Sequence, residues 1–511
     1  MSRTKNAIIN TKYAIISKIV SLLLGFVSRT VFISILGTTY LGINGLYTEV
    51  LSVLSFAELG FGTALIYAMY APVAHNDEQT IIKLLDFYKK VYRIIAAIIA
   101  VGGLAIVPFL QYIVRGADTL TLFDLRLYFL IFLTNTVTSY FVTYKYSYIN
   151  ALQKNYLVTN ISTVISFATV ILQIITIFIF RSFLIYLLTQ TTIGLLSKIV
   201  ISLYLNKQFP ILKKKPTVPL SKEEKQPIYR EVRGLIVHQF SSVAVHATDN
   251  IIISSLTGLG VVAVGFVSNY NMLMNAVLGF VKQIFGSVTS GFGNLAASSS
   301  KEHFRKVFLT SNFINFWIYG FCCIAFYILI PPFITLWIGA DKLIDPISFL
   351  LIIVNCYLQG QCTIFDNARV AVGNFNKDKW WSLAQALVNL IVSIIGAKAL
   401  GLVGIYIGTV ASRLVFVIFR PYSTYSYMFG RTSREYYFIL IKYLVSVVLA
   451  GIVAYSITSM ILTSVTIIRF LISAVVVAIV PNAVFFVFYY KTEVFKDVLT
   501  RIKDIRRIKS V

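Results

Sequence analysis

The chain has 511 residues, of which 58% are hydrophobic and 13% are charged, and its mean hydropathy is +0.80. This balance excludes an ordinary water-soluble globular protein, whose surface needs far more charge. The net charge of +25 would suggest nucleic acid as the partner of a soluble protein, but in so apolar a chain it is first an indication of membrane topology.

Apolar runs of about 20 residues, long enough to cross the hydrocarbon core of a bilayer, follow one another along the chain. They are far longer than the ~10 alternating residues of a barrel strand, so we predict an all-α, polytopic membrane protein. The sequence predicts about 14 transmembrane helices, over residues 13–36, 41–70, 94–114, 123–144, 156–180, 183–205, 235–257, 262–292, 307–333, 347–368, 380–397, 401–419, 438–459 and 466–489.

An even number of spans places both termini on one side of the membrane. If the N-terminus is cytoplasmic, the cytoplasmic segments hold 33 of the 45 Lys and Arg residues, and the outer segments hold six. Basic residues concentrate in cytoplasmic loops, so we predict that both termini are cytoplasmic. This topology accounts for most of the positive charge, and no nucleic acid partner is expected.

A basic segment between the sixth and seventh helices divides the chain into two halves, and its Lys and Pro content is typical of a flexible linker. The basic C-terminal tail either lies on anionic headgroups as an amphipathic helix or is solvated. The predicted regions are an N-terminal lobe over residues 1–205, a cytoplasmic linker over 206–234, a C-terminal lobe over 235–419, helices thirteen and fourteen over 420–489, and the tail over 490–511.

The two halves resemble each other at an offset of 223 residues. At this offset Gly37 meets Gly260, Gly42 meets Gly265 and Tyr47 meets Tyr270. Because 223 residues contain six predicted helices, the halves would have the same orientation, related by an axis along the membrane normal. We therefore predict two six-helix lobes around a central cavity, with two further C-terminal helices, which is a plan found in transporters.

Polar and ionisable side chains form stripes at helical spacing inside four of the predicted helices. Such groups are costly in hydrocarbon, so they usually face a cavity or one another. Helices one, two, seven and eight hold equivalent places in the two halves, so their stripes imply a shared polar cavity. The candidates are Lys18 and Arg29 in helix one, Asn44 and Glu58 in helix two, His246 and Asp249 in helix seven, and Asn271, Asn275 and Lys282 in helix eight.

Structural roles compete with functional ones at several of these positions. Lys18 can reach the cytoplasmic interface by extending its side chain, and Glu58 and Lys282 can form a static ion pair. His246, one turn before Asp249, either relays a proton or is a hydrogen-bonded structural residue. Further cavity or hinge candidates in helices four and ten are Asn135, Thr138, Lys145, Asn355, Gln359, Asp366 and Arg369. Asp366 and Arg369 are three residues apart, so the alternative is that they pair with each other.

Motifs of several enzyme classes are absent from the sequence. It contains no Gly-rich phosphate loop ending in Gly-Lys-Ser/Thr, no His-Glu-x-x-His helix and no Gly-x-Ser-x-Gly elbow. The four cysteines lie in apolar runs, which favours buried thiols over a disulfide framework or a zinc site. We therefore expect neither an enzyme nor a bound cofactor or metal. A membrane-embedded glycan transferase or polymerase is the alternative from a different class.

The second helix and the loop after it are similar to a known family. The residues that carry this similarity are Gly37, Tyr40, Leu41, Gly42 and Tyr47, then Ala57, Glu58, Leu59, Gly60, Gly62 and Ala64, and finally Tyr67, Tyr70, Ala71, Pro72 and Asp77. They resemble the polysaccharide transport branch of the multidrug/oligosaccharidyl-lipid/polysaccharide exporter superfamily, the Wzx-type O-antigen and capsule flippases. Thr248, Asp249 and Asn250 look like the seventh helix of the same family.

The resemblance implies a flippase in the bacterial cytoplasmic membrane. It would carry undecaprenyl-diphosphate-linked oligosaccharides of capsule, exopolysaccharide or O-antigen across the membrane by alternating access, driven by Na⁺ or H⁺. The two additional helices resemble those of lipid II flippases, where they form a groove for the lipid tail. Implied partners are the lipid-linked oligosaccharide, membrane lipids, a glycan polymerase and other polysaccharide assembly proteins.

The resemblance also suggests roles for the polar residues. Lys18, Arg29 and Lys282, with Asn44, Asn271 and Asn275, would bind the substrate, and Asp249, Glu58 and His246 would serve ion coupling or gating. The buried acids depart from a purely cationic cavity. The alternatives are a drug/ion antiporter or a lipid II flippase of the same superfamily, and a scaffold for glycan synthesis that transports nothing.

Overall fold

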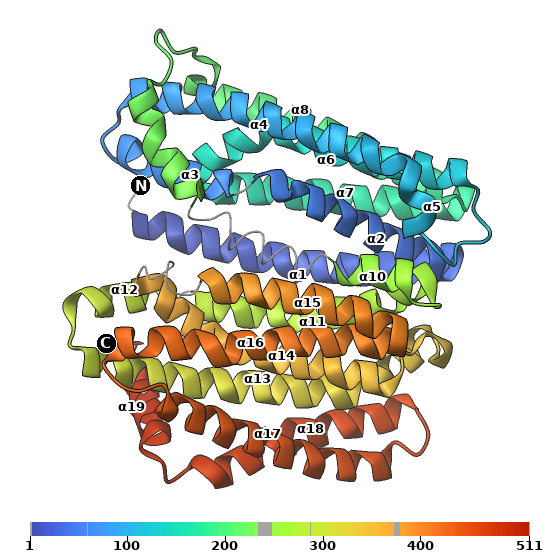
Figure 1. Cartoon of the computed structure of the whole chain (residues 1–511), viewed down its shortest axis with the longest axis vertical. Coiled ribbons are helices and arrows are strands. Elements are labelled where there is room, and N and C mark those ends of the chain that lie inside the picture. The colour runs from blue at the N-terminus through green and yellow to red at the C-terminus, as the bar shows by residue number, and fades with distance from the viewer. Residues whose placement is uncertain (1–2, 59, 234–247, 287, 373–378, 510–511) are drawn as a thin grey trace. The chain divides into compact units, whose positions relative to one another are not determined.

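The computed structural model describes residues 3–58, 60–233, 248–286, 288–372 and 379–509. These residues form helices joined by short turns, with no strand among them, which confirms the all-α prediction (Figure 1). Twelve helices in the described part are long and apolar enough to cross a membrane. Of the 14 predicted spans, the second is interrupted and most of the seventh lies outside the described residues.

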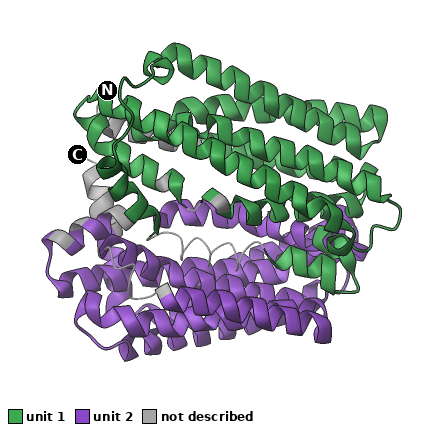
Figure 2. Ribbon diagram, turned by 45° about the horizontal axis from the view of Figure 1, so that its top comes forward, with its two compact units in different colours: residues 1–265 green, residues 266–511 purple. Residues whose placement is uncertain are grey.

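The chain divides into two compact units, residues 1–265 and 266–511, which are coloured separately in Figure 2. Unit 1 contains a helix over residues 222–233, and the helix that begins at Gly260 starts in unit 1 and continues into unit 2. Its other helices are α1 (Arg3–Leu36), α2 (Thr38–Leu54), η1 (Ser55–Glu58), α3 (Phe61–Ala74), α4 (Glu78–Ile106), η2 (Val107–Phe109), α5 (Leu110–Ile113), α6 (Leu122–Ala151), α7 (Asn155–Phe180), α8 (Phe183–Gln208), η3 (Pro210–Lys213) and α10 (Asp249–Leu256).

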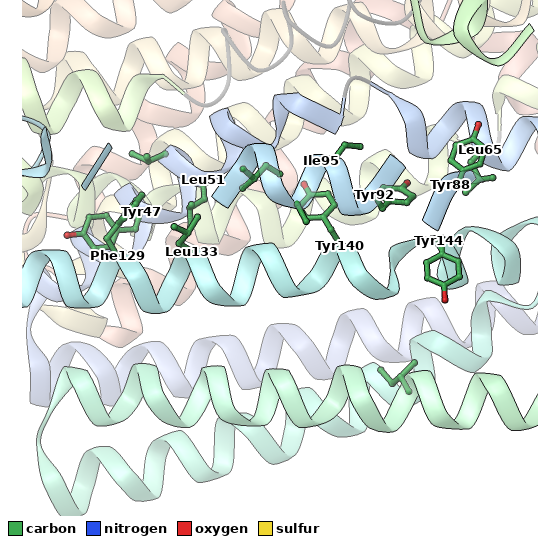
Figure 3. Packing of buried hydrophobic residues seen from close by; sticks show 14 of the residues in the cluster. Tyr47, Leu51, Leu65, Tyr88, Tyr92, Ile95, Phe129, Leu133, Tyr140 and Tyr144 are labelled. Carbon is green, nitrogen blue, oxygen red and sulfur yellow. The ribbon is translucent and has the colours of Figure 1, made fainter. Parts of the chain in front are cut away.

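Tyrosine and aliphatic side chains form much of the core of unit 1, mainly between α2, α4 and α6. Figure 3 shows Tyr47 beside Phe129 and Tyr92 beside Tyr140. The rings of Tyr47 and Phe129 meet edge to face at 5.3 Å, and the Tyr47 hydroxyl donates to the Leu125 carbonyl at 2.9 Å. A buried tyrosine needs such an acceptor, because an unsatisfied hydroxyl in an apolar core is costly.

The second predicted span is not one continuous helix. It consists of α2, the single turn η1, and α3, and Gly60 at the break has φ of 79°, a left-handed conformation that suits glycine. The prediction of one helix over residues 41–70 is therefore wrong, because hydropathy alone does not register a change of backbone direction within an apolar run.

Helix α10 and the first turn of α11 (Gly260–Gly286) pack against the N-terminal part of unit 1. The Ser254 hydroxyl donates to the Ile113 carbonyl at 2.7 Å, and the Val261 amide donates to the Arg115 carbonyl at 2.7 Å. A Cβ at Gly42 would lie 1.9 Å from the Val261 oxygen. The close backbone contact between α2 and α11 therefore requires glycine at position 42.

Unit 2 includes both C-terminal spans, which pack on α13; the Phe316 and Tyr443 rings stack at 4.1 Å. Its four cysteines are free and buried, as predicted. Besides most of α11, its helices are α12 (Val288–Ser298), α13 (Lys301–Ile338), η4 (Ala340–Lys342), α14 (Pro346–Val372), α15 (Lys379–Leu400), α16 (Leu402–Phe429), α17 (Arg434–Ile461), α18 (Ile467–Tyr489) and α19 (Glu493–Lys509).

The C-terminal tail forms the helix α19, which is held against the start of α13. The Phe495 ring stacks on Trp317 at 5.9 Å, and the Asp497 carboxylate accepts from the Thr310 hydroxyl at 2.8 Å and lies 3.4 Å from Lys306. The beginning of the tail is therefore packed on the protein and not solvated throughout.

Candidate functional site

Two acidic side chains lie close together where α10 packs on α2. Glu49 of α2 accepts a hydrogen bond from the Asn250 amide of α10 at 2.9 Å, and Asp249 is near enough for its charge to act on Glu49. Asn250 is 8% exposed, and Asp249 begins α10, where the helix dipole favours a negative charge. Two neighbouring carboxylates can share a proton, and carboxylate and amide oxygens are hard ligands suited to a hard cation such as Na⁺.

Asp249 was predicted from the sequence, but Glu49 was not. Glu49 follows the predicted Asn44 by five residues, which does not fit the spacing of three or four residues that defines the polar stripe. A carboxylate within an apolar run was the available signal. Asn44 is half-buried in α2, and His246 lies outside the described residues.

Glu58 lies in the break between α2 and α3. The Tyr92 hydroxyl of α4 donates to its carboxylate at 3.4 Å. A Cβ at Gly62 would come within 2.8 Å of the Glu58 carboxylate oxygen and 3.1 Å of the Tyr92 hydroxyl, so a side chain at position 62 would displace the Glu58 carboxylate. Discontinuous helices form the binding sites of many transporters.

Arg29 of α1 belongs to a polar group in unit 1. It lies near Tyr186 of α8, which is hydrogen-bonded with Gln173 of α7, and Gln173 donates to Gln190 at 3.4 Å. Lys18, three turns earlier in α1, is half-buried. Two of the three predicted cations, Lys18 and Arg29, are therefore on α1, and Arg29 is supported by α7 and α8.

Asn271, Asn275 and Lys282 form one exposed face of α11 in unit 2. Their spacing of four and seven residues places them on the same side of the helix. None of them has a hydrogen bond or ion pair with another described residue. Because exposed amides and an ammonium group are unfavourable in lipid, this face suits a water-filled cavity. Glu58 belongs to unit 1 and Lys282 to unit 2, so the ion pair between them stays a prediction.

Two lysines are held between α6 and α8: Lys198, which was not predicted, and Lys145, which was a further cavity or hinge candidate. The Lys198 ammonium donates to the Asn135 carbonyl, the Asn135 side chain and the Thr138 hydroxyl at 2.7, 2.8 and 2.9 Å. Lys145 donates to Ser202 at 2.6 Å and to Asn206 at 2.9 Å. These lysines tie two helices together, which favours a structural role.

Three arginines are buried between α14 and α16 in unit 2. Arg420 forms an ion pair with Asp366, and Arg369 lies 3.9 Å from the same carboxylate. Arg413 donates to Asn355 at 3.2 Å. The sequence suggested a local Asp366–Arg369 pair, but the closer partner of Asp366 is Arg420, which is 54 residues away in the chain.

An apolar groove lies among α13, α14, α16 and α17 in unit 2. It comprises two adjoining hollows of about 540 and 400 Å³ that share Tyr327, Ile328 and Tyr455. The smaller hollow reaches α11 at Tyr270, which is adjacent in sequence to the first residue of the polar face, Asn271. Its hydroxyl-bearing lining residues include Tyr270, Thr335, Thr458 and Ser459.

Comparison with known proteins identifies related sequences and folds. Residues 7–290 match the family described as polysaccharide biosynthesis protein. The solved structure of the lipid II flippase MurJ in an inward closed conformation has a TM-score of 0.67 at 15% identity, covering 94% of this chain and 98% of that one. No curated protein matches the sequence.

Multidrug transporters have a related fold. The inward-facing conformation of a multidrug resistance MATE family transporter of the MOP superfamily has a TM-score of 0.58 at 18% identity, covering 78% of this chain and 93% of that one. Its outward-facing counterpart has a TM-score of 0.55 at 18% identity, covering 82% and 94%. The fold is thus shared by flippases and drug transporters.

Proposed function

Because the chain belongs to the polysaccharide biosynthesis protein family, we propose that it is a flippase for undecaprenyl-diphosphate-linked oligosaccharides. It would move these lipids from the cytoplasmic to the outer leaflet of the bacterial cytoplasmic membrane by alternating access. The sugar-diphosphate headgroup cannot cross ~30 Å of hydrocarbon unaided, and a polar cavity lowers that barrier while the prenyl tail stays in an apolar environment.

The observation that carries this proposal is that α11 bears a polar face and also contributes Tyr270 to the lining of an apolar groove. Asn271 begins the polar face, and the neighbouring Tyr270 lines the groove. A lipid-linked sugar has the same two-part character, with a polar head and a long apolar tail. In this proposal the head contacts Asn271, Asn275 and Lys282, and the tail occupies the groove.

The cationic and amide side chains in unit 1 fit the same substrate. Lys18 and Arg29 of α1 offer positive charge to the diphosphate or to acidic sugars, and Asn44 offers an amide to hydroxyl groups. Glu58, in the break between α2 and α3, would take part in gating, since a broken helix changes direction more easily than a continuous one.

The carboxylates of Glu49 and Asp249 are the proposed coupling site for Na⁺ or H⁺. Asn250 fixes Glu49 through a hydrogen bond of 2.9 Å, so the two acids are held together within unit 1. Binding of a cation would relieve the repulsion between the two carboxylates. An ion gradient would then act on the packing of α10 against α2.

Reconstitution tests the flippase directly. Purified full-length protein is placed in liposomes with a labelled undecaprenyl-diphosphate-linked oligosaccharide, and the label exposed on each leaflet is measured under Na⁺ or H⁺ gradients. We expect gradient-dependent translocation without a change in lipid mass. Absence of headgroup transfer under every gradient would contradict the proposal, and a product of altered mass would favour a transferase or polymerase.

The coupling site is tested in the same assay with Glu49→Gln and Asp249→Asn. Each substitution removes one negative charge, so we expect translocation to lose its dependence on the ion gradient. The matched control is Asp118→Asn, an exposed acid in the loop before α6. Equal gradient dependence in Asp249→Asn and the control would refute the ion-coupling role.

A drug/ion antiporter is the second candidate, because the MATE transporters share the fold. Cells lacking the protein would then accumulate dyes while their surface glycan stays normal. Depletion followed by identification of the lipid-linked sugar that accumulates on the cytoplasmic leaflet separates the capsule, O-antigen and lipid II alternatives.

A further inference from the structure

The linker between α8 and α10 is partly folded, although its composition suggested a flexible chain. Residues 222–233 form a helix that begins with a capping box. The Ser221 amide donates to the Glu224 carboxylate at 2.7 Å, and the Glu224 amide donates to the Ser221 hydroxyl at 3.2 Å. This reciprocal arrangement satisfies amide groups at the helix start and fixes where the helix begins.

The linker helix is docked on the first turns of α4. Ile228 and Val232 are buried, the Tyr229 ring meets Phe87 edge to face at 6.2 Å, and the Lys225 ammonium lies 5.6 Å from the Phe87 ring. Lys83 of α4 donates to Glu224 at 3.2 Å. Apolar, cation–π and ionic contacts therefore hold the helix in one orientation.

The side of the linker helix next to the docked side is basic and hollowed, and Tyr229 and Lys225 line the hollow as well as contacting Phe87. Lys222, Gln226, Tyr229, Arg230 and Arg233 recur at spacings of three and four, so they share one side of the helix. The hollow has a volume of about 720 Å³, and its described lining consists of these five residues with Lys225 and Glu223. Four cations against one carboxylate, with an amide and a phenol as further donors, match a compact anion with several oxygens.

The position of Phe87 along α4 relates this hollow to the membrane surface. Lys89, Lys90 and Arg93 are exposed on α4, and the exposed apolar residues begin at Ile94. Phe87 precedes Ile94 by seven residues, or about 10 Å along the helix axis. Headgroup layers extend about 5–8 Å beyond the hydrocarbon core. Phe87, beside the hollow, thus lies just outside the headgroup layer, on the side that the basic loops mark as cytoplasmic.

We propose that the basic face of the linker helix captures the diphosphate of the prenyl-linked substrate on the cytoplasmic side. This inference rests on the proposed flippase function and adds a loading site outside the membrane-spanning helices. Arg230 and Arg233 would hold phosphate oxygens by paired N–H groups, Lys222 would add charge, and Gln226 and Tyr229 would donate hydrogen bonds. A discrete hollow with directional donors favours a diphosphate over the diffuse charge of anionic phospholipids.

Binding of undecaprenyl diphosphate to the full-length protein in nanodiscs tests the site. The triple variant Lys222→Gln/Arg230→Gln/Arg233→Gln is compared with the control Lys207→Gln/Lys213→Gln/Lys215→Gln, which removes the same charge from exposed linker positions outside the hollow. We expect an affinity loss of at least about 10-fold in the triple variant and of less than about 2-fold in the control. Equal losses in both would overturn the proposal.

Further arms distinguish the sources of phosphate and guard against misfolding. Undecaprenyl monophosphate should bind more weakly than the diphosphate, and inorganic pyrophosphate should compete. Competition by phosphatidylglycerol at equal charge would assign the face to anionic phospholipids and overturn the proposal. The variant Gln226→Leu/Tyr229→Phe leaves the charge unchanged, and we expect a loss of about 2- to 5-fold; its unchanged affinity would contradict directional recognition.

The outcome is separable from that of the flippase assay. Loss of diphosphate binding in the triple variant, with no translocation by the parent protein, would support the capture site and refute the flippase. Translocation by the parent and by the triple variant, with equal diphosphate affinity, would support the flippase and refute the capture site.

Discussion

Each unit buries a basic residue toward the end of one of its long helices. α6 begins at Leu122 and α14 at Pro346, and Lys145 and Arg369 are each the twenty-fourth residue of their helix. Lys145 is 5% exposed and Arg369 is 6% exposed. Their surroundings differ, since Lys145 donates to the neutral oxygens of Ser202 and Asn206, whereas Arg369 lies beside the carboxylate of Asp366.

This difference follows from the chemistry of the two cations. A lysine ammonium is compact, and two or three neutral oxygens satisfy its donors, as they do for Lys145 and Lys198. A guanidinium has five donors in a rigid plane and keeps its charge, so a buried pair of arginines needs an acid. Unit 1 therefore stabilises its helix pair through neutral acceptors, and unit 2 depends on Asp366.

The largest effect is expected from Asp366→Asn. The substitution leaves Arg369 and Arg420 buried beside a neutral amide, so we expect a loss of about 3–5 kcal/mol in the free energy of unfolding. Denaturant unfolding of the purified protein in detergent measures it. The control is Asp341→Asn, an exposed acid of the same unit, which should change stability by less than about 1 kcal/mol. Equal stability of the two variants would remove the distinction between the units.

A smaller effect is expected from Lys198→Met in unit 1. The acceptors on Asn135 and Thr138 lose their donor, but no charge is left without a partner, so the cost should be about 1–3 kcal/mol. The same unfolding experiment measures it, with the exposed Lys207→Met as control. A loss of unfolding free energy larger than that of Asp366→Asn would show that the neutral acceptors of Lys198 contribute more to stability than the Asp366 carboxylate does.

Substitution of Arg369 and of Lys145, one in each unit, extends the comparison. Arg369→Lys keeps the charge but loses the planar donor set, and we expect it to cost about 1–2 kcal/mol. Lys145→Met is measured alongside. Its loss of unfolding free energy should be similar, because the oxygens of Ser202 and Asn206 lose their donor, as those of Asn135 and Thr138 do in Lys198→Met. An Arg369→Lys variant as stable as the parent would mean that charge alone is required at this position.

The smallest effect belongs to ion pairs outside the membrane. The pKa of Glu224 lies below its usual value because the Ser221 amide and the Lys83 ammonium donate to its carboxylate. Stability from such a depressed pKa is present above the unfolded value of 4.5 and is lost as the pH falls through the folded value. Hydrogen exchange of residues 222–233 should therefore accelerate slightly on acidification toward pH 4, beyond the intrinsic pH effect.

Lys83→Met should weaken this pH dependence, because it removes one of the donors to Glu224. Lys213→Met is the control, since Lys213 has no ion pair with another described residue. Identical exchange profiles for the two variants would indicate that the apolar contacts of Ile228 and Val232 alone hold the linker helix.

The sequence was sufficient to predict the membrane class and most spans, because hydrocarbon requires long apolar helices whatever their partners. It also located the polar face of α11, since spacing along a single helix determines which residues share a side. The break after Glu58 was missed because Gly60 and Gly62 are small residues within an apolar run and do not lower its hydropathy enough.

Partners that depend on packing between distant segments could not be derived from spacing. Asn250 meets Glu49 across 201 residues, and Lys198 meets Asn135 across 63. From the sequence, the alternative partner for Asp366 was its near neighbour Arg369, because spacing shows i,i+3 relations but not the approach of α16. Each of these contacts is set by how two helices cross, which local patterns do not contain.

The hydrogen bonds from Lys198 to Asn135 and Thr138 also constrain how the protein is inserted into the membrane. As α8 leaves the ribosome it carries a lysine that, at a helix centre, costs about 2.5–3.5 kcal/mol on insertion scales. Its acceptors on Asn135 and Thr138 belong to α6, which is synthesised earlier. If α6 stays near the insertion channel, it can supply those acceptors when α8 enters. Membrane integration of α8 alone should consequently be less efficient than integration of the α6–α8 segment, so that biogenesis proceeds by groups of helices rather than by single spans.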